Sequence, residues 1–363
     1  MDPRTILFSL GYAAYGPIIL QMLLWLAERA QKRGVDRLFF LAREGYMLKH
    51  FYDRFADLPQ IRARFGTLPP STYLLTSRRA CIGAIAKNPS DPEFVEIALT
   101  PSFKGTLSDL LDRRIGITPS DFARLGLVDR PVVLPEDVSV VAVALRRARA
   151  LCAERTGVER DAYLAYLSAA GLMASSHAGL VDLGFSGTIQ RCLHTITGKT
   201  MSGFYFATTE VAARWSCERN AAFSCFGTID RSDGTRPFPV YGDSLLLEAW
   251  LTSPDGQLIR FEQGQTGSVP LFAAAGSAQR HLPMLMAIRD GSEQYIRQTL
   301  ELCGSSIESL GIDAHSTQQV FRHLLAYDMV PQQVHQYLVV EDQFCGNAEL
   351  SVFELYRARD AVA

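Results

Sequence analysis

Several features that mark large classes of proteins are missing from this sequence. Its seven cysteines are an odd number and include no Cys-x-x-Cys pair, which argues against a disulfide framework or a zinc site and favours a reducing compartment. The net charge is only −2 at pH 7, so no bulk positive field attracts nucleic acid. There are no internal repeats and no low-complexity tracts. What is present is a chain of 363 residues, 48% of them hydrophobic, which is typical of a folded protein with one large or two smaller domains.

The N-terminal region also lacks charge. No charged residue occurs between Arg4 and Glu28, and the apolar run over 6–27 approaches the roughly 20 residues that a membrane-spanning helix requires. Two glycines and a proline interrupt this run, and no small-residue cleavage site follows it. These interruptions favour a buried helix over 17–32, packed on a sheet, rather than a membrane segment. Peripheral contact with a membrane stays open.

The alternation of short apolar runs with helical patterns predicts an α/β protein with a doubly wound, mostly parallel sheet. The expected strands cover residues 36–42, 72–76, 178–182, 203–208, 223–229 and 256–261.

A change of pattern after residue 88 predicts a large helical insertion, with one helix over 138–153. The expected parts are 1–88 as the first half of the core, 89–176 as the insertion, 177–262 as the second half with a phosphate loop, and 263–363 as a helical C-terminal region.

The segment from Ala178 to Leu193 is the most informative part of the sequence. A buried strand delivers the acid Asp182, a turn of small and hydroxyl residues follows, and then the apolar spacing of a helix resumes. Backbone N–H groups at such a turn, together with the helix dipole, attract phosphate, and an acid at the strand end can bind sugar hydroxyls. The expected phosphate-binding residues are Gly184, Phe185, Ser186, Gly187, Thr188 and Ile189.

Two further loops leave the carboxyl ends of predicted strands. They contain Arg43, Glu44 and Gly45 in the first loop, and Ser77, Arg78 and Arg79 in the second. Loops at this edge of an open parallel sheet line a common crevice. Arginine suits pyrophosphate because its fork binds two oxygens and stays charged. Together with Asp182, these loops fit transfer or cleavage at a sugar that carries two separate phosphate groups.

Structural alternatives stay open for each of these residues. In the structural interpretation of the first loop, Arg43 and Glu44 form an ion pair at the start of a helix. In that of the second loop, both arginines are simply solvated. Asp182 would be only a helix N-cap. Glu248 lies in an apolar segment, so it is either an acid at the edge of the core with a partner or a catalytic base.

The order of these parts resembles the type I phosphoribosyltransferase fold. Residues 38–45 resemble its pyrophosphate loop, 73–79 its second strand with a basic exit, and 181–189 its loop for phosphoribosyl diphosphate (PRPP). More narrowly, the chain resembles the phosphoribosyltransferase modules of bacterial surface-polysaccharide clusters, which are often fused to a haloacid-dehalogenase-like phosphatase. The phrases that carry this likeness are Gly16-Pro17, Phe40–Tyr46, Thr76–Arg79, Val181–Gln190 and Leu247–Pro254, within residues 5–260.

The resemblance implies transfer of 5-phosphoribose from PRPP to a glycan hydroxyl in O-antigen or capsule biosynthesis, with release of pyrophosphate. A partner phosphatase would later remove the 5-phosphate and leave ribofuranose. Mg²⁺ would accompany PRPP. The acceptor glycan, free or lipid-linked, would lie against the insertion and the C-terminal region, in the cytoplasm or at the inner face of the membrane.

The resemblance also implies roles for single residues. Pyrophosphate would be bound by Arg43, Gly45, Ser77, Arg78 and Arg79. The carboxylate that takes the acceptor proton is expected among Glu44, Asp182 and Glu248. The chain departs from the broad family at Leu183, where a second acid is usual. Ribose would then be held by Asp182 with another acid such as Glu44, or through Mg²⁺.

Two other functions stay open. Asp182 at a strand end also resembles the nucleophile of a haloacid-dehalogenase-like phosphohydrolase, although Gly184 stands where that pattern requires a second acid. The remaining hypothesis is a non-catalytic module that binds a sugar phosphate.

Overall fold

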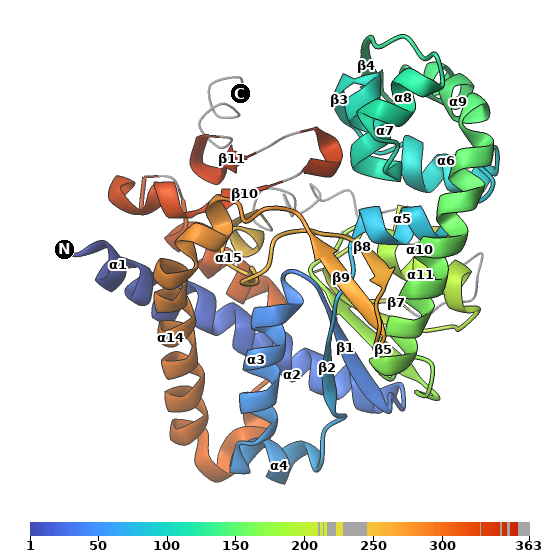
Figure 1. Cartoon of the computed structure of the whole chain (residues 1–363). Helices are drawn as coiled ribbons and strands as arrows, with labels where there is room; N and C mark the ends of the chain where they lie inside the picture. The colour runs from blue at the N-terminus through green and yellow to red at the C-terminus, as the bar shows by residue number, and fades with distance from the viewer. Residues whose placement is uncertain are drawn as a thin grey trace.

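A parallel sheet forms the centre of the computed structural model, which describes residues 1–209, 211–212, 214–215, 223–227, 245–326, 328–341, 343–346 and 349–354. The five strands are all parallel and lie in the order β2-β1-β5-β6-β7 (Figure 1). They are β1 (Arg37–Leu41), β2 (Ser71–Leu74), β5 (Ala178–Asp182), β6 (Ser202–Ala207) and β7 (Phe223–Gly227). The predicted α/β class with a parallel sheet is confirmed. Residues 228–229 of the strand expected over 223–229 lie outside the described residues.

Helices cover both faces of this sheet, because successive side chains of a strand point to opposite faces. In β1, Leu38 and Phe40 join the core beneath α2, α3 and α14, whereas Phe39 and Leu41 join the core beneath α5, α10 and α11. All four side chains are fully buried, which is why the strand is an uninterrupted apolar run. The helices are α2 (Gly16–Lys32), α3 (Gly45–Ala56), α14 (Ser277–Cys303), α5 (Arg78–Ile85), α10 (Arg149–Ala169) and α11 (Thr188–Thr197).

The N-terminal residues form one continuous helical run. It consists of α1 (Pro3–Leu10), a π-helical turn η1 (Gly11–Tyr15) and α2. By length and composition this run could cross a membrane, a test that core helices of soluble proteins also pass, and 61% of its most apolar window is buried inside the protein. A Cβ at Gly11 would lie 2.2 Å from the carbonyl oxygen of Ile288 in α14, so the two helices touch backbone to backbone. The run therefore packs as part of the core.

Between β2 and β5 lies a helical region that also contains a short ribbon (top right of Figure 1). Its elements are α6 (Pro92–Leu99), β3 (Phe103–Thr106), α7 (Leu107–Ile115), α8 (Pro119–Arg124), β4 (Pro131–Leu134), α9 (Val138–Arg147) and the start of α10. The antiparallel ribbon β3–β4 was not predicted, because strands of four residues that contain glycine or proline show no period-2 pattern. The single helix expected over 138–153 is two helices, which meet at Ala148.

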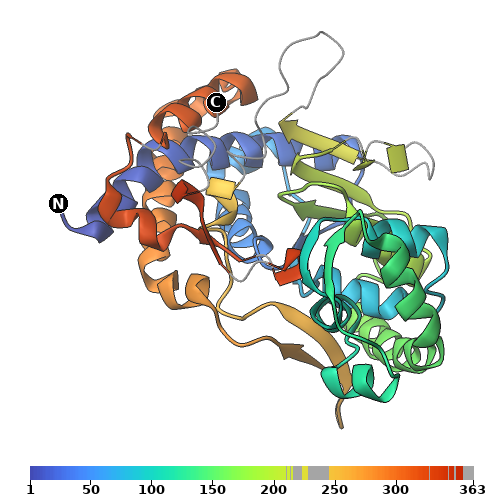
Figure 2. The same ribbon diagram turned by 90° about the horizontal axis from the view of Figure 1, so that it is seen from above.

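The C-terminal region begins with an antiparallel hairpin, β8 (Leu258–Gln263) and β9 (Ser268–Phe272), where the sequence predicted one short strand. After α14, the chain returns across the molecule toward the insertion (Figure 2). The smaller elements are α4 (Pro59–Phe65), η2 (Gly304–Ser309), α15 (Ala314–Leu324), η3 (Gln332–Tyr337), β10 (Val339–Val340), η4 (Gln343–Cys345) and β11 (Leu350–Ser351).

Candidate active site at the carboxyl edge of the sheet

The three loops singled out in the sequence meet at one edge of the sheet. They follow β1, β2 and β5, and β1 lies between the other two strands. Because all three strands are parallel, their carboxyl ends open on the same side. From β1, the chain first continues to β2 on one side of β1 and later to β5 on the other side of β1. In open α/β sheets, ligands bind in a crevice at such a reversal of direction, which here falls at the carboxyl ends of β1 and β5.

Three acids gather at this crevice. Asp182 ends β5, Glu44 follows β1, and Glu248 lies in the helical turn 245–248. Burial raises the pKa of Asp182 well above its usual value, and the charges of Glu44 and then Glu248 raise it further. The backbone N–H groups of Leu183 and Gly184 oppose this rise. The other two carboxylates that the sequence marked as candidates, Glu44 and Glu248, are therefore both close enough to Asp182 to raise its pKa.

The donor set of this cluster is all carboxylate oxygen, which suits Mg²⁺ better than a softer metal. In the described part of the chain, no three His, Cys, Asp or Glu side chains are arranged as a metal-binding group. Mg²⁺ commonly uses only one or two carboxylates and completes its coordination with water and phosphate oxygens of a substrate. Asp182 and Glu44 fit that mode of binding.

The turn after Asp182 starts a helix and leaves its N-terminus uncapped by side chains. Gly187 is the N-cap, with a left-handed φ of 66°, and none of the described side chains caps α11. The first turn of α11 carries no acid, so nothing there offsets the positive end of the helix dipole. The expected phosphate-binding residues Gly184 to Ile189 thus form the helix start that the sequence predicted.

Contacts with β6 hold this turn in place. The N–H of Ala207 donates to the carbonyl of Leu183 at 3.0 Å, and the N–H of Thr209 donates to the carbonyl of Phe185 at 2.9 Å. A Cβ at Gly184, which has a φ of 156°, would lie 2.5 Å from the carbonyl oxygen of Ala207. Glycine is therefore required where the turn touches β6. The peptide bond between Gly184 and Phe185 is cis, as is the one before Arg43.

Arg43 is bound by an acid that the sequence gave no reason to connect with it. Its guanidinium lies 3.3 Å from the carboxylate of Glu341 and donates to the Glu341 carbonyl at the same distance. The sequence left open an ion pair between the side chains of Arg43 and Glu44, but the contact between these two residues is of a different kind. The Glu44 carboxylate accepts the backbone N–H of Arg43 at 3.0 Å.

Gly45 has a role in the fold that the sequence did not reveal. A Cβ at this position would lie 2.5 Å from the carbonyl carbon of Phe40 in β1. Only glycine allows α3 to begin so close to the strand that precedes it. This packing places the first turn of α3 directly beside Glu44 and Arg43.

Two residues of the second loop do not support their predicted role in binding pyrophosphate. The Ser77 hydroxyl accepts the N–H of Ala80 at 2.9 Å and donates to the carbonyl of Leu258 at 2.7 Å, so it caps α5 and anchors β8. Arg79 is only 4% exposed and makes two hydrogen bonds, of 2.9 and 3.0 Å, to Glu159 of α10. Both groups are committed to the fold, and we therefore leave them out of the site.

Arg78 keeps its place at the crevice. It is partly exposed, and its guanidinium lies 4.5 Å from the ring centre of Phe344 in η4. Glu341 and Phe344 come from the same C-terminal segment, so this segment contacts both arginine loops. The sequence predicted helices there and contained no motif to indicate this contact, because the partners lie far apart along the chain.

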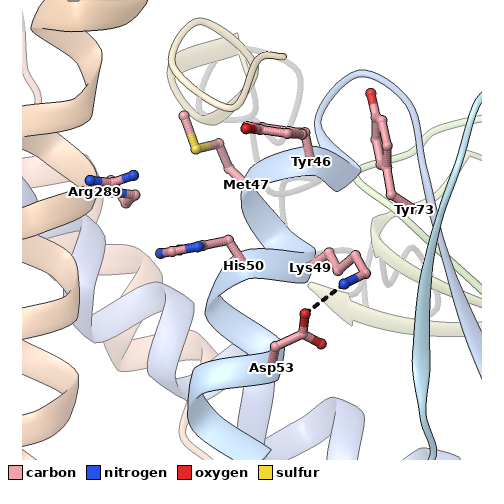
Figure 3. Close-up of a pocket in the computed structure, with 7 residues that line it drawn as sticks. All are labelled: Tyr46, Met47, Lys49, His50, Asp53, Tyr73 and Arg289. Carbon is pink, nitrogen blue, oxygen red and sulfur yellow. Dashed lines mark hydrogen bonds and ion pairs between the residues drawn. The ribbon is translucent and has the colours of Figure 1, made fainter. Parts of the chain in front are cut away.

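A cavity of about 290 Å³ adjoins the crevice along the first turns of α3 (Figure 3). Tyr46 of α3 and Tyr73 of β2 stand at its upper end, with ring centres 5.7 Å apart. Burial raises the pKa of Tyr73, and the nearby charge of Glu44 raises it further. Because Tyr46 follows Glu44 by two residues and Tyr73 pairs with Phe40 of β1, the cavity begins close to the loop that carries Glu44. The sequence did not indicate the cavity, although both tyrosines belong to the segments that carry the family resemblance.

No protein-family model and no curated protein matches this chain.

Proposed function

We propose that this protein is a glycosyltransferase that moves 5-phosphoribose from PRPP to a glycan hydroxyl and releases pyrophosphate. The observation that carries this proposal is the meeting of three acids with an uncapped helix N-terminus at the carboxyl edge of a parallel sheet. A second, basic end of the same crevice is formed by Arg43 and Arg78. A donor with a phosphate at one end and a pyrophosphate at the other matches these two ends.

The proposed donor position follows from this arrangement. The N–H groups of residues 186–189 and the hydroxyls of Ser186 and Thr188 clamp the 5-phosphate. Asp182 and Glu44 would lie beside the ribose hydroxyls of the bound donor. Pyrophosphate competes with Glu341 for the Arg43 guanidinium, because a polyanion offers the fork more charge than one carboxylate. Binding energy far from the reacting carbon would thus orient the reaction.

In the proposed reaction, the bond between ribose C1 and the pyrophosphate oxygen breaks and pyrophosphate leaves with the electron pair. The acceptor hydroxyl oxygen forms the new bond to C1 from the opposite face, and its proton passes to a carboxylate. Glu44 or Asp182 is the proposed base, with Glu248 third. The raised pKa of Asp182 makes its carboxylate a stronger base than an ordinary aspartate. Mg²⁺ bound with the donor would supply neutralisation of the leaving charge.

The proposed cellular setting is bacterial polysaccharide synthesis, either O-antigen or capsule. The acceptor glycan would be lipid-linked or free, and the site of action would be the cytoplasm or the inner face of the membrane. A haloacid-dehalogenase-like phosphatase would act on the product and remove the 5-phosphate.

The direct test is incubation with PRPP, Mg²⁺ and a panel of glycans, followed by measurement of pyrophosphate and of product mass. We expect pyrophosphate release that depends on an acceptor, with a mass increase equal to one phosphoribosyl group. Absence of release with every acceptor, together with phosphate release from simple phosphate esters, would instead support a phosphohydrolase. Tight PRPP binding without any turnover would support the non-catalytic module.

A further inference from the structure

The cavity along α3 has walls of mixed chemistry. Tyr46, Lys49, His50 and Asp53 come from the first turns of α3, and Tyr73 and Arg289 close it from β2 and α14 (Figure 3). Its volume of about 290 Å³ is just below the range for small-molecule sites, which begins at about 300 Å³. This is room for a single sugar unit rather than for a long chain. The remaining sugars of an oligosaccharide would extend into solvent.

The position of the cavity connects it with the proposed chemistry. Tyr46 follows Glu44 by two residues, and Tyr73 pairs with Phe40 of β1, the strand that leads into the loop with Glu44. A molecule held between the two tyrosines would therefore lie close to the loop that carries one of the proposed bases. The insertion, where the sequence placed part of the acceptor side, packs on the opposite face of the sheet with α5 and α10.

The charges of the cavity wall are balanced in pairs. Lys49 lies 2.6 Å from Asp53, and Arg289 lies 2.7 Å from Asp290. His50 contacts Glu293 through its Nε2 atom. Because each cation of the wall already has a carboxylate partner, the cavity does not present the unpaired positive charge that a carboxylate or phosphate ligand requires.

The same pairs are well suited to hydroxyl groups. A sugar hydroxyl both donates and accepts, so it can bridge an ammonium donor and a carboxylate acceptor such as Lys49 and Asp53. Tyr46 is 38% exposed, and its aromatic side chain lines the cavity. A neutral sugar ring has an apolar face for such an aromatic surface and a rim of hydroxyls for the paired charges.

We propose that this cavity is the acceptor subsite and that it binds one neutral sugar unit, which presents a hydroxyl to Glu44. This inference rests on the proposed transfer from PRPP. It adds the location of the acceptor and its chemical class, an uncharged glycoside rather than a uronic acid or a sugar phosphate.

The test compares acceptors and variants in the whole protein with PRPP and Mg²⁺. The probes are neutral p-nitrophenyl hexosides and the matching glucuronide, with pyrophosphate release as the readout. We expect turnover of at least one neutral hexoside and weaker turnover of the glucuronide. Tyr46→Ala and Asp53→Asn should each raise the acceptor KM about tenfold, because each removes a contact to the bound sugar. Tyr46→Phe keeps the ring and should raise the acceptor KM less than Tyr46→Ala does.

Calorimetric titration with PRPP separates the two proposals. The cavity variants should bind PRPP within about twofold of the wild type. Turnover that is unaffected by both Tyr46→Ala and Asp53→Asn overturns the acceptor subsite while the proposed transfer stands. A preference for the glucuronide overturns the neutral class. Failure of the wild type to bind PRPP overturns the proposed transfer, and with it the acceptor role of the cavity. Unfolding midpoints measured in parallel show whether a variant is simply unfolded.

Discussion

Two loops at the same edge of the sheet start helices in opposite ways. The loop after β2 begins α5 with the Ser77 hydroxyl as its cap, and the buried Arg79 next to it pairs with Glu159. The turn after β5 begins α11 at Gly187, and none of the described side chains caps it. The sequence predicted that both segments bind the donor, the first at its pyrophosphate and the second at its 5-phosphate. The Ser77 hydroxyl and the Arg79 guanidinium are thus engaged in holding the fold together, whereas the N–H groups at the start of α11 receive no side-chain cap from the described residues.

The largest expected effect is on catalysis at the β5 turn. Asp182→Asn should lower pyrophosphate release about 10²–10⁴-fold, because it removes a carboxylate from the site of proton transfer or ribose binding. The matched control is Asp161→Asn on the exposed surface of α10, which should retain full activity. Equal activity of the Asp182 variant and this control would contradict the proposed site.

The next largest effect is expected on the free energy of unfolding, for a variant in the loop after β2. Arg79→Met leaves Glu159 buried without its partner and should lower the free energy of unfolding by about 3–5 kcal/mol. Combining Arg79→Met with Glu159→Met should restore most of this loss, as measured by urea unfolding. Activity per folded molecule should stay within about twofold of the wild type. A selective loss of PRPP affinity in the folded double variant would show that Arg79 does contribute to donor binding.

The stability of the wild type and of the Asp182→Asn variant should depend differently on pH. The pKa of Asp182 is raised in the folded protein, so the folded state holds this proton more tightly than the unfolded chain does. The resulting stabilisation is present below the ordinary pKa of aspartate and is lost as the pH rises toward the folded-state value. The stability of Asp182→Asn relative to the wild type should therefore increase as the pH rises from about 5 to about 8. Urea unfolding at both pH values checks this, and a constant difference would show that the pKa is not raised.

The smallest effect is expected for the cap of α5. Ser77→Ala removes the hydroxyl that accepts the Ala80 N–H and should lower the free energy of unfolding by about 1 kcal/mol. Pyrophosphate release should be unchanged once the protein is folded. Thermal unfolding and a steady-state assay measure the two quantities separately. A loss of activity larger than the loss of folded protein would mean that Ser77 does contact the donor.

The sequence predicted the parts of the site that depend on local pattern and strand direction. Asp182, Glu44 and Gly187 follow apolar strands, and parallel strands bring such positions to one edge whatever the other details of packing. Glu341 was beyond prediction because its contact with Arg43 joins residues 298 positions apart. The Arg79–Glu159 pair was missed for the same reason, since a polar loop looks alike whether its arginine faces solvent or a buried acid.

The proposed crevice has two anion-binding ends, and calorimetry tests this proposal most directly. Titrations with PRPP and with ribose 5-phosphate, each with Mg²⁺, compare a ligand that fills both ends with one that fills only the end at α11. We expect tighter binding of PRPP. We also expect Arg43→Ala to reduce PRPP affinity toward that of ribose 5-phosphate, whose own binding should not change. Equal affinity of the wild type for both ligands, or selective binding of a nucleotide sugar, would contradict this proposal.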